Sequence, residues 1–311
     1  MKKPRFTPLG PVLVLLLLAV SCWVLQHQLQ AFHYHDIVRT LEVIPGWRLG
    51  LAAVLTTLSY LLLTGYDALA LYYLRHPLRY GKVALASFIG YVFSYNIGLS
   101  ILGGSAVRFR LYSSWGLSTA EIAKVVAFCS LTFWLGVLTV TGVALLMESP
   151  RLLTALPLPF TCARFLGVIL LGLVVWYLTW GAIKKTPLRL LRWEFPLPPP
   201  QVSLGQIGLS TLDWCLAGGV CYALLPPSLS LSYPAFLGVF ALAQVAGLIS
   251  HVPGGIGIFE TVILLFLSPR IPAASVLGSL VAYRGIYYLL PLAIASALLA
   301  AHEVIRGKVM E

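Results

Sequence analysis

Charged residues are scarce in this chain of 311 residues, where they make up only 10% of the sequence. A soluble globular domain carries about 25% charged residues. Hydrophobic residues account for 59% of the chain, and its mean hydropathy is +0.91. This composition excludes an ordinary cytosolic enzyme, a disordered regulator and a small secreted disulfide scaffold. It favours an all-α polytopic membrane protein.

Cysteines are also few, and their positions exclude a disulfide framework. The chain has five, and none of them form a Cys-x-x-Cys pair. Four lie inside apolar runs: Cys22, Cys129, Cys215 and Cys221. Cysteines in such surroundings are typical of packing residues rather than of disulfides or metal ligands.

Neither a metal site nor a nucleic-acid surface is indicated. The loop containing His27, His33, His35 and Asp36 has ligand-type side chains, but their spacing matches no common metal site. The 21 basic residues exceed the 10 acidic ones, yet they are scattered among hydrophobic blocks and form no solvated face. We therefore expect no metal, no cofactor and no nucleic-acid partner.

The apolar runs predict the membrane-spanning segments. A helix needs roughly 20 apolar residues to cross a bilayer. About six runs are long enough: residues 9–26, 48–74, 119–147, 163–182, 203–225 and 273–300. The first resembles a secretory signal, but because more membrane segments follow it, we interpret it as a retained helix. We expect a single integral membrane domain over 1–311, with the first helix and an outer loop over 1–45.

Positive residues predict the orientation, because cytoplasmic loops are enriched in lysine and arginine. The strongest basic loop, over 183–202, is expected in the cytoplasm. Residues 75–82, which contain Arg75, Arg79 and Lys82, are expected on the same side. Basic residues at both ends of the chain predict that both termini are cytoplasmic.

Two shorter apolar segments are interrupted by glycine or proline. The interruptions are Gly103-Gly104 and Pro253-Gly254-Gly255, and each follows a helix with one embedded acid. We expect two broken, re-entrant hairpins in an inverted repeat whose halves are 46–147 and 203–302. Interrupted segments at matching places in inverted halves are typical of a transporter with a site at the membrane midplane. Alternatively, the glycines are packing kinks.

Ionisable residues inside the apolar segments form the candidate site. A charge there costs at least about 2.5–3.5 kcal/mol, so such a residue is usually functional or paired. The candidates are Asp67, Arg108, Arg110, Asp213, His251, Glu260 and Arg284. The three acids and three arginines balance in charge, which predicts one buried network. It either lines a polar path for a charged cargo or serves the fold alone.

The candidates have expected roles, and Asp67, Glu260 and Asp213 would exchange contacts with Arg284 or with a cationic head group. Backbone amides freed at Gly103-Gly104, together with the Arg108 guanidinium, would cradle a phosphate. Arg110 cannot face the same way, so we expect it nearer the cytoplasmic head groups. Asp67 would meet an ammonium group or Arg108. His251 would relay a proton or simply bond a neighbour.

Five short motifs carry a resemblance to a known family. They are residues 65–70, 103–112, 113–117, 251–260 and 282–291. Together they resemble the membrane domain of bacterial lysylphosphatidylglycerol synthase/flippases (MprF), and more closely the stand-alone YbhN-type proteins of the inner membrane. The resemblance implies translocation of an aminoacylated lipid, with Asp67 and Arg108 matching the family's embedded acid and arginine. The chain ends at Glu311, so we expect no aminoacyltransferase domain and no synthase activity.

The sequence therefore predicts a phospholipid flippase of the bacterial inner membrane rather than an enzyme. Its expected partner is a membrane phospholipid, anionic or aminoacylated, with a homodimer or a separate lipid-modifying enzyme as a further partner. One alternative is a non-transporting accessory protein that docks a partner. A remote alternative is an intramembrane hydrolase that uses Ser105 with His251.

Overall fold

The computed structural model describes residues 44–97, 100–147, 160–183, 188–190, 193–195, 198–227, 231–250, 252–268 and 271–310. The expected first helix at 9–26, the histidine-containing loop that follows it, and His251 lie outside these residues.

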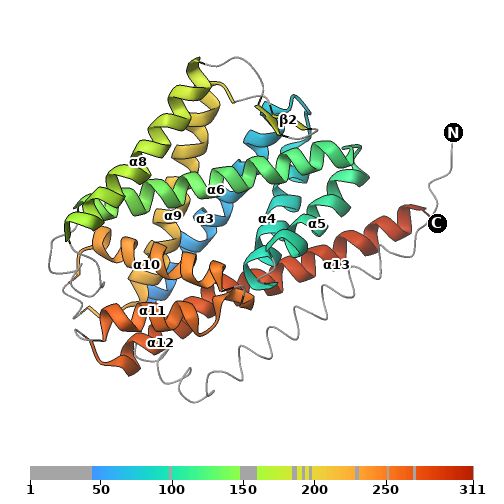
Figure 1. The fold of residues 1–311 in the computed structure, drawn as a ribbon. Coiled ribbons are helices and arrows are strands. Elements are labelled where there is room, and N and C mark those ends of the chain that lie inside the picture. Colours follow the sequence, from blue (N-terminus) through green and yellow to red (C-terminus); the bar gives the residue numbers. More distant parts are fainter. Residues whose placement is uncertain are drawn as a thin grey trace.

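The described residues are almost entirely helical (Figure 1). The first half contains α3 (Gly46–Tyr73), α4 (Tyr80–Ile97), α5 (Ser100–Ser114), α6 (Thr119–Met147) and α8 (Phe160–Ile183). The second contains α9 (Pro200–Leu224), α10 (Tyr233–Ile249), a 3-10 turn η1 (Pro253–Gly255), α11 (Ile258–Leu267), α12 (Ala273–Tyr283), a π-helical turn η2 (Arg284–Leu289) and α13 (Leu290–Met310). Between α8 and α9, where a plain loop was expected, β1 (Leu188–Leu190) and β2 (Trp193–Phe195) pair as a short antiparallel hairpin.

Five of the six predicted spans fall on helices that are long and apolar enough to cross a membrane. They are Gly46–Tyr73, Thr119–Met147, Ala163–Ile183, Pro200–Leu224 and Ala273–Val304. The sixth is the one outside the described residues. The polytopic helical fold is confirmed.

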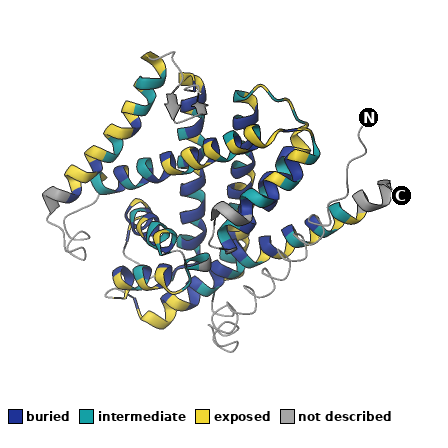
Figure 2. Cartoon of the chain, turned by 45° about the vertical axis from the view of Figure 1, so that its right-hand side comes forward, coloured by how far each residue is buried: buried dark blue, intermediate teal, exposed yellow. Residues whose placement is uncertain are grey.

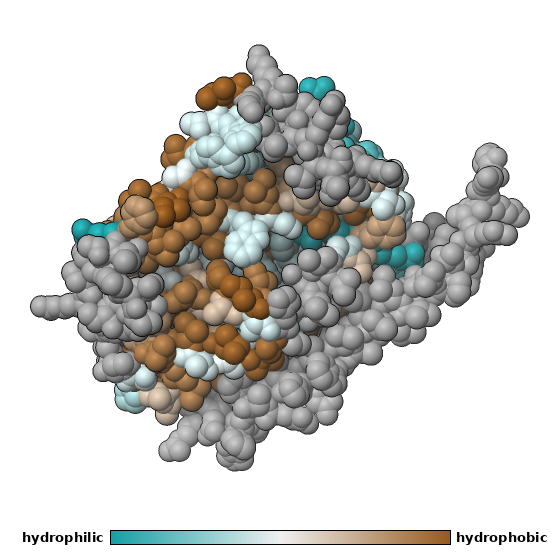
Figure 3. Space-filling view, in the orientation of Figure 1, coloured by the Kyte–Doolittle hydropathy of each residue, from teal (hydrophilic) through white to brown (hydrophobic). Residues whose placement is uncertain are grey.

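Large apolar side chains cover much of the outer surface. On α8 they include Phe165, Val168, Val175 and Trp176, each more than half exposed. Buried residues gather where the helices cross, and exposed residues follow the outward faces (Figure 2). Hydrophobic residues dominate the coloured part of the face in Figure 3. An exposed apolar surface of this kind is stable in lipid, because no water must be ordered around it.

The centre of the fold is an antiparallel pair formed by α3 and α9. Arg48 near the start of α3 donates to the Leu225 carbonyl just after the end of α9 (2.7 Å). Ser59 and Asp213 meet midway, at 2.6 Å. The last two turns of α3 contact the first turns of α9, since a Cβ on Gly205 would touch Leu69. The two helices therefore run in opposite directions.

This pairing makes the two hairpins begin at opposite ends of the α3–α9 pair. The α4–α5 hairpin follows the end of α3, and the α10–α11 hairpin follows the end of α9. Helix α11 has only 10 residues and is about 15 Å long, half of a hydrocarbon core. In each half a long helix, two shorter ones and another long helical stretch follow in the same order. The inverted repeat itself stays a prediction.

The expected break at Gly103-Gly104 is wrong. Both glycines lie inside the helix α5, which runs from Ser100 to Ser114. A Cβ on Gly104 would collide with the Ser94 side chain and the Gly90 carbonyl oxygen. Gly104 therefore allows α5 to pack closely against α4, and the helical backbone at this pair does not free amides for a phosphate.

The expected break at Pro253-Gly254-Gly255 is confirmed. Gly254, Gly255 and Gly257 have φ values of 62°, 63° and 82°, in the left-handed region that residues with a Cβ seldom adopt. They turn the chain between α10 and α11. The η2 turn, which the sequence did not indicate, interrupts the last long helix at Arg284.

Candidate functional site

A cavity of about 220 Å³ lies between the two hairpins. One side is formed by α4 and α5, and the opposite side by α10 and η1; side chains from α6, α9 and η2 complete the wall. Both halves of the chain thus contribute residues of their hairpins to one cavity. The midplane position that the paired interruptions predicted for such a site stays a prediction.

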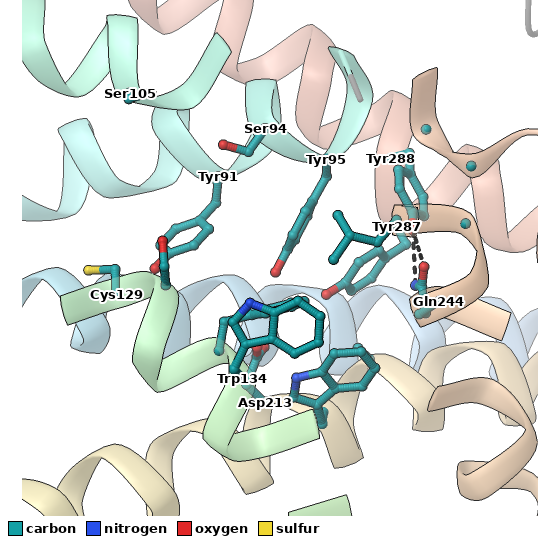
Figure 4. Close-up of a pocket in the computed structure, with 18 of the residues that line it drawn as sticks. Tyr91, Ser94, Tyr95, Ser105, Cys129, Trp134, Asp213, Gln244, Tyr287 and Tyr288 are labelled. Carbon is teal, nitrogen blue, oxygen red and sulfur yellow. Dashed lines mark hydrogen bonds between the residues drawn. The ribbon is translucent and has the colours of Figure 1, made fainter. Parts of the chain in front are cut away.

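Aromatic side chains form much of the cavity wall. Tyr91 and Tyr95 project from α4, Trp134 from α6, and Tyr287 and Tyr288 from η2 (Figure 4). The rings of Tyr95 and Tyr287 are stacked, with centroids 6.4 Å apart. Gln244 on α10 donates to the Tyr288 hydroxyl at 3.1 Å. The wall thus combines π faces with hydroxyl and amide groups, which suits a polar ligand that carries positive charge.

Asp67 and Arg108 form a buried bidentate ion pair between α3 and α5. Arg108 Nε and Nη2 donate to the two Asp67 carboxylate oxygens at 2.9 and 3.0 Å. The hydroxyls of Ser87 and Tyr112 also donate to Asp67, at 2.7 and 3.0 Å. Arg108 lines the cavity and stacks over Tyr91, with Cζ 4.3 Å from the ring centroid. The carboxylate neutralises the guanidinium and fixes its orientation at the cavity wall.

Glu260 and Arg284 form a second buried ion pair at the confirmed break. Arg284 Nε donates to Glu260 Oε1 at 2.8 Å, and Arg284 Nη1 donates to the Gly254 carbonyl. Glu260 accepts a hydrogen bond from the Gly257 amide at 2.7 Å, which caps α11. Arg284 Nη2 is buried and has no hydrogen-bond partner among the described residues. Because Tyr288 and Gly254 line the cavity and both contact Arg284, this donor lies close to the cavity wall.

Asp213 is the third buried acid, and it differs from the other two. It lines the cavity, is 3% exposed, and has no ion-pair partner among the described residues. Ser59 and Tyr66 on α3 donate to its two oxygens at 2.6 and 3.1 Å. The Ser59 hydroxyl has a single hydrogen, and it donates that hydrogen to Asp213. In the 3.0 Å hydrogen bond between Ser59 and Tyr287, the Tyr287 hydroxyl is therefore the donor. A chain of hydroxyls therefore links the carboxylate to the aromatic wall.

The predicted single network is two ion pairs and one separate acid in the structure. Arg110 belongs to neither pair: its Nη2 is 3.1 Å from Glu303 Oε2 on α13, and it is not one of the cavity-lining residues. Ser105 does line the cavity, while its suggested partner, His251, lies outside the described residues. No group of three or more His, Cys, Asp or Glu side chains that could hold a metal occurs among the residues described.

Sequence reasoning missed the aromatic and hydroxyl residues around the charges. Tyr91, Tyr95 and Tyr287 were not singled out, because tyrosine is common in this chain, with 15 copies. A weak signal existed for the partners of Asp213. Ser59 and Tyr66 are seven residues apart, which places them on one face of a helix.

The fold and the cavity define a multi-pass α-helical membrane protein with paired charges around a buried polar site. The family model for the lysylphosphatidylglycerol synthase TM region matches residues 9–295. The chain therefore belongs to this family.

Individual relatives agree with the assignment. The chain is 42% identical to slr0712 of Synechocystis over 292 residues, covering 94% of this chain and 91% of that protein. It is 33% identical to the inner membrane protein YbhN of Escherichia coli, over 78% of this chain and 76% of YbhN. It is 26% identical to a phosphatidylglycerol lysyltransferase of Staphylococcus aureus, over 87% of this chain but only 31% of that protein.

Proposed function

We propose that this protein moves the head group of a phospholipid across the bacterial inner membrane through the cavity between its two hairpins. The observation that carries the proposal is the cavity itself. It is lined by elements from both halves of the fold, including Arg108 and the unpaired carboxylate of Asp213, and Arg284 contacts the lining residues Gly254 and Tyr288. The similarity to the inner membrane protein YbhN supports the location.

The charges around the cavity match the charges of a phospholipid head group. Arg108 faces the cavity, and Arg284 holds one unused donor beside it. Guanidinium groups bind phosphate through paired hydrogen bonds. Asp213 and the tyrosine rings offer the complementary site for a positively charged part of the head group. Asp67 and Glu260 would keep both arginines oriented while the cargo is absent.

The size of the cavity determines which part of the lipid enters. A volume of about 220 Å³ holds a head group but not two acyl chains, so the chains would stay in the surrounding lipid. This division keeps the apolar surface of the acyl chains in contact with lipid throughout the movement.

The proposed role is transport rather than chemistry. The described residues offer a binding cavity, and aminoacyl transfer would need a domain outside the matched family region. The partner is then a membrane phospholipid, anionic or aminoacylated. If the lipid is aminoacylated, a separate lipid-modifying enzyme supplies it.

Transport can be tested with purified protein in phospholipid vesicles. The rate at which a labelled phosphatidylglycerol becomes accessible to a membrane-impermeant reductant is measured. We expect Arg108→Ala and Asp213→Asn each to lower the rate at least about tenfold, as loss of one charge-assisted hydrogen bond predicts. The control is Arg79→Gln, which removes an exposed charge away from the cavity. Unchanged transport in both cavity variants would contradict the proposal.

One observation favours a second candidate, a non-transporting accessory protein. Both cavity arginines are already held by carboxylates, as in a network that serves the fold alone. This candidate predicts that vesicles containing the unmodified protein show no transport. It also predicts that Arg108→Ala lowers the melting temperature or releases a partner.

A further inference from the structure

A second groove lies outside the cavity, between the end of α3 and the start of α4. Its volume is about 390 Å³. Buried or half-buried apolar side chains, including Leu71, Leu78 and Val83, form its floor. Two tyrosines flank it: Tyr72 is 75% exposed and Tyr80 is 57% exposed. We call this the Arg75 groove, after the charged residue at its edge.

Arg75 has an unusual backbone conformation. Its φ is 55°, and among the described residues it is the one non-glycine residue with a positive φ. The His76 amide donates to the Leu71 carbonyl, and the Arg75 amide to the Tyr72 carbonyl, both at 3.1 Å. This is the Schellman pattern that ends a helix, and its left-handed position is usually occupied by glycine. Arginine there is strained, because its Cβ crowds the backbone.

No contact within the described part of the chain explains why an arginine occupies this position. Arg75 is exposed, and its side chain has no hydrogen bond or ion pair with the described residues. The neighbouring His76 also lines the groove and already has a partner, since its Nδ1 is 3.3 Å from Glu121 Oε1. A strained backbone with a free charged side chain indicates a ligand that is not part of the chain.

We propose that the Arg75 groove binds one anionic phospholipid. The guanidinium would bind the phosphate, and the apolar floor would bind the upper part of an acyl chain. Tyr72 and Tyr80 would lie at the head-group level, where aromatic residues concentrate at the ends of membrane helices. The floor offers few polar groups to a soluble phosphate, whereas a lipid satisfies both parts of the groove. This inference requires membrane insertion but not the proposed translocation.

The test uses the full-length protein in detergent micelles, titrated with dioleoylphosphatidylglycerol and followed by native mass spectrometry. Arg75→Gly removes the guanidinium and relieves the strained conformation. We expect its apparent Kd to rise about tenfold. We expect its melting temperature without lipid to equal or exceed that of the unmodified protein. A structural role for Arg75 predicts a lower melting temperature instead.

Two comparisons make the result specific. Arg79→Gly removes an exposed arginine four residues away that does not line the groove, and we expect it to bind the lipid as the unmodified protein does. Dioleoylphosphatidylcholine and soluble glycerol 1-phosphate should both bind more weakly than phosphatidylglycerol. Unchanged binding in Arg75→Gly, an equal loss in Arg79→Gly, or equal binding of glycerol 1-phosphate would overturn the proposal.

Discussion

At the scale of single residues, three buried carboxylates have different surroundings. Asp67 and Glu260 each hold a guanidinium, while Asp213 accepts hydrogen bonds from hydroxyl groups alone among the described residues. Removing one partner of a buried ion pair leaves a charge without compensation, which costs more than the pair contributes. Removing an acid that has no cation partner strands no charge. The first two acids are therefore expected to stabilise the fold, and Asp213 is the acid that the proposed function assigns to the cargo.

This difference predicts opposite behaviour in two matched variants. Asp67→Asn should lower the free energy of unfolding by about 3–5 kcal/mol, because it leaves Arg108 uncompensated. Asp213→Asn should change it by about 1 kcal/mol or less, because the amide oxygen still accepts one hydroxyl. Denaturant titration of both variants in the same micelles measures the difference. Equal losses would show that Asp213 also has a cation partner.

The charged residues of the site could be predicted from the sequence, but their pairing could not. Asp67, Arg108, Asp213, Glu260 and Arg284 are conspicuous because each interrupts an apolar run. Their partners depend on where helices cross, and Asp67 is 41 residues from Arg108. The equal number of buried acids and arginines was therefore interpreted as one network. In the structure the Asp67–Arg108 pair joins α3 to α5, and the Glu260–Arg284 pair joins α11 to η2.

At the scale of elements, glycine pairs have two different structural roles. Gly254 and Gly255 turn the backbone through positive φ, and Gly104 allows two helices to touch. A diglycine is compatible with either role, so the sequence alone did not distinguish them. Pro253 beside the second pair is the one difference that could have separated the two roles, since proline disfavours continuation of a helix.

The packing role of Gly104 can be tested by adding a single methyl group. Gly104→Ala should lower the free energy of unfolding by about 1–3 kcal/mol, because α5 must move away from α4. Gly172→Ala is the control: it lies within α8 with open space around its Cβ position, and alanine favours the helix by about 0.5–1 kcal/mol. Thermal melting of both variants measures the contrast. A stable Gly104→Ala variant would contradict the close approach.

The η2 turn could not be predicted from the apolar pattern of its own segment. A π-turn inserts one residue into a helical turn and occurs often at functional sites. Here it spans Arg284–Leu289 and supplies Tyr287 and Tyr288 to the cavity. The apolar pattern of this segment is the same for an α-helix, so the turn arises from tertiary packing and not from local preference.

At the scale of the whole molecule, the antiparallel α3–α9 pair determines where the hairpins begin. Length and hydropathy were sufficient to predict the spans, because a bilayer requires long apolar helices. The inverted repeat adds the prediction that the two hairpins enter the membrane from opposite faces. The positive-inside pattern adds a prediction of sidedness: the start of α3 lies outside, and the α3–α4 loop lies in the cytoplasm.

Sidedness can be measured by labelling single cysteines after the five native ones are replaced by alanine. Trp47→Cys should react with a membrane-impermeant maleimide in cells whose inner membrane is intact. Arg79→Cys should react only after that membrane is permeabilised. Both positions are exposed, so access to the reagent depends on the side of the membrane. Labelling of both from one side would refute the predicted orientation.

The aromatic wall also gives the protein a built-in optical reporter. Trp134 and Trp214 both line the cavity, and they are two of only eight tryptophans in the chain. The emission of an indole ring depends on the polarity of its surroundings. Entry of any molecule into this space would therefore change the intrinsic spectrum, without a dye attached to the protein.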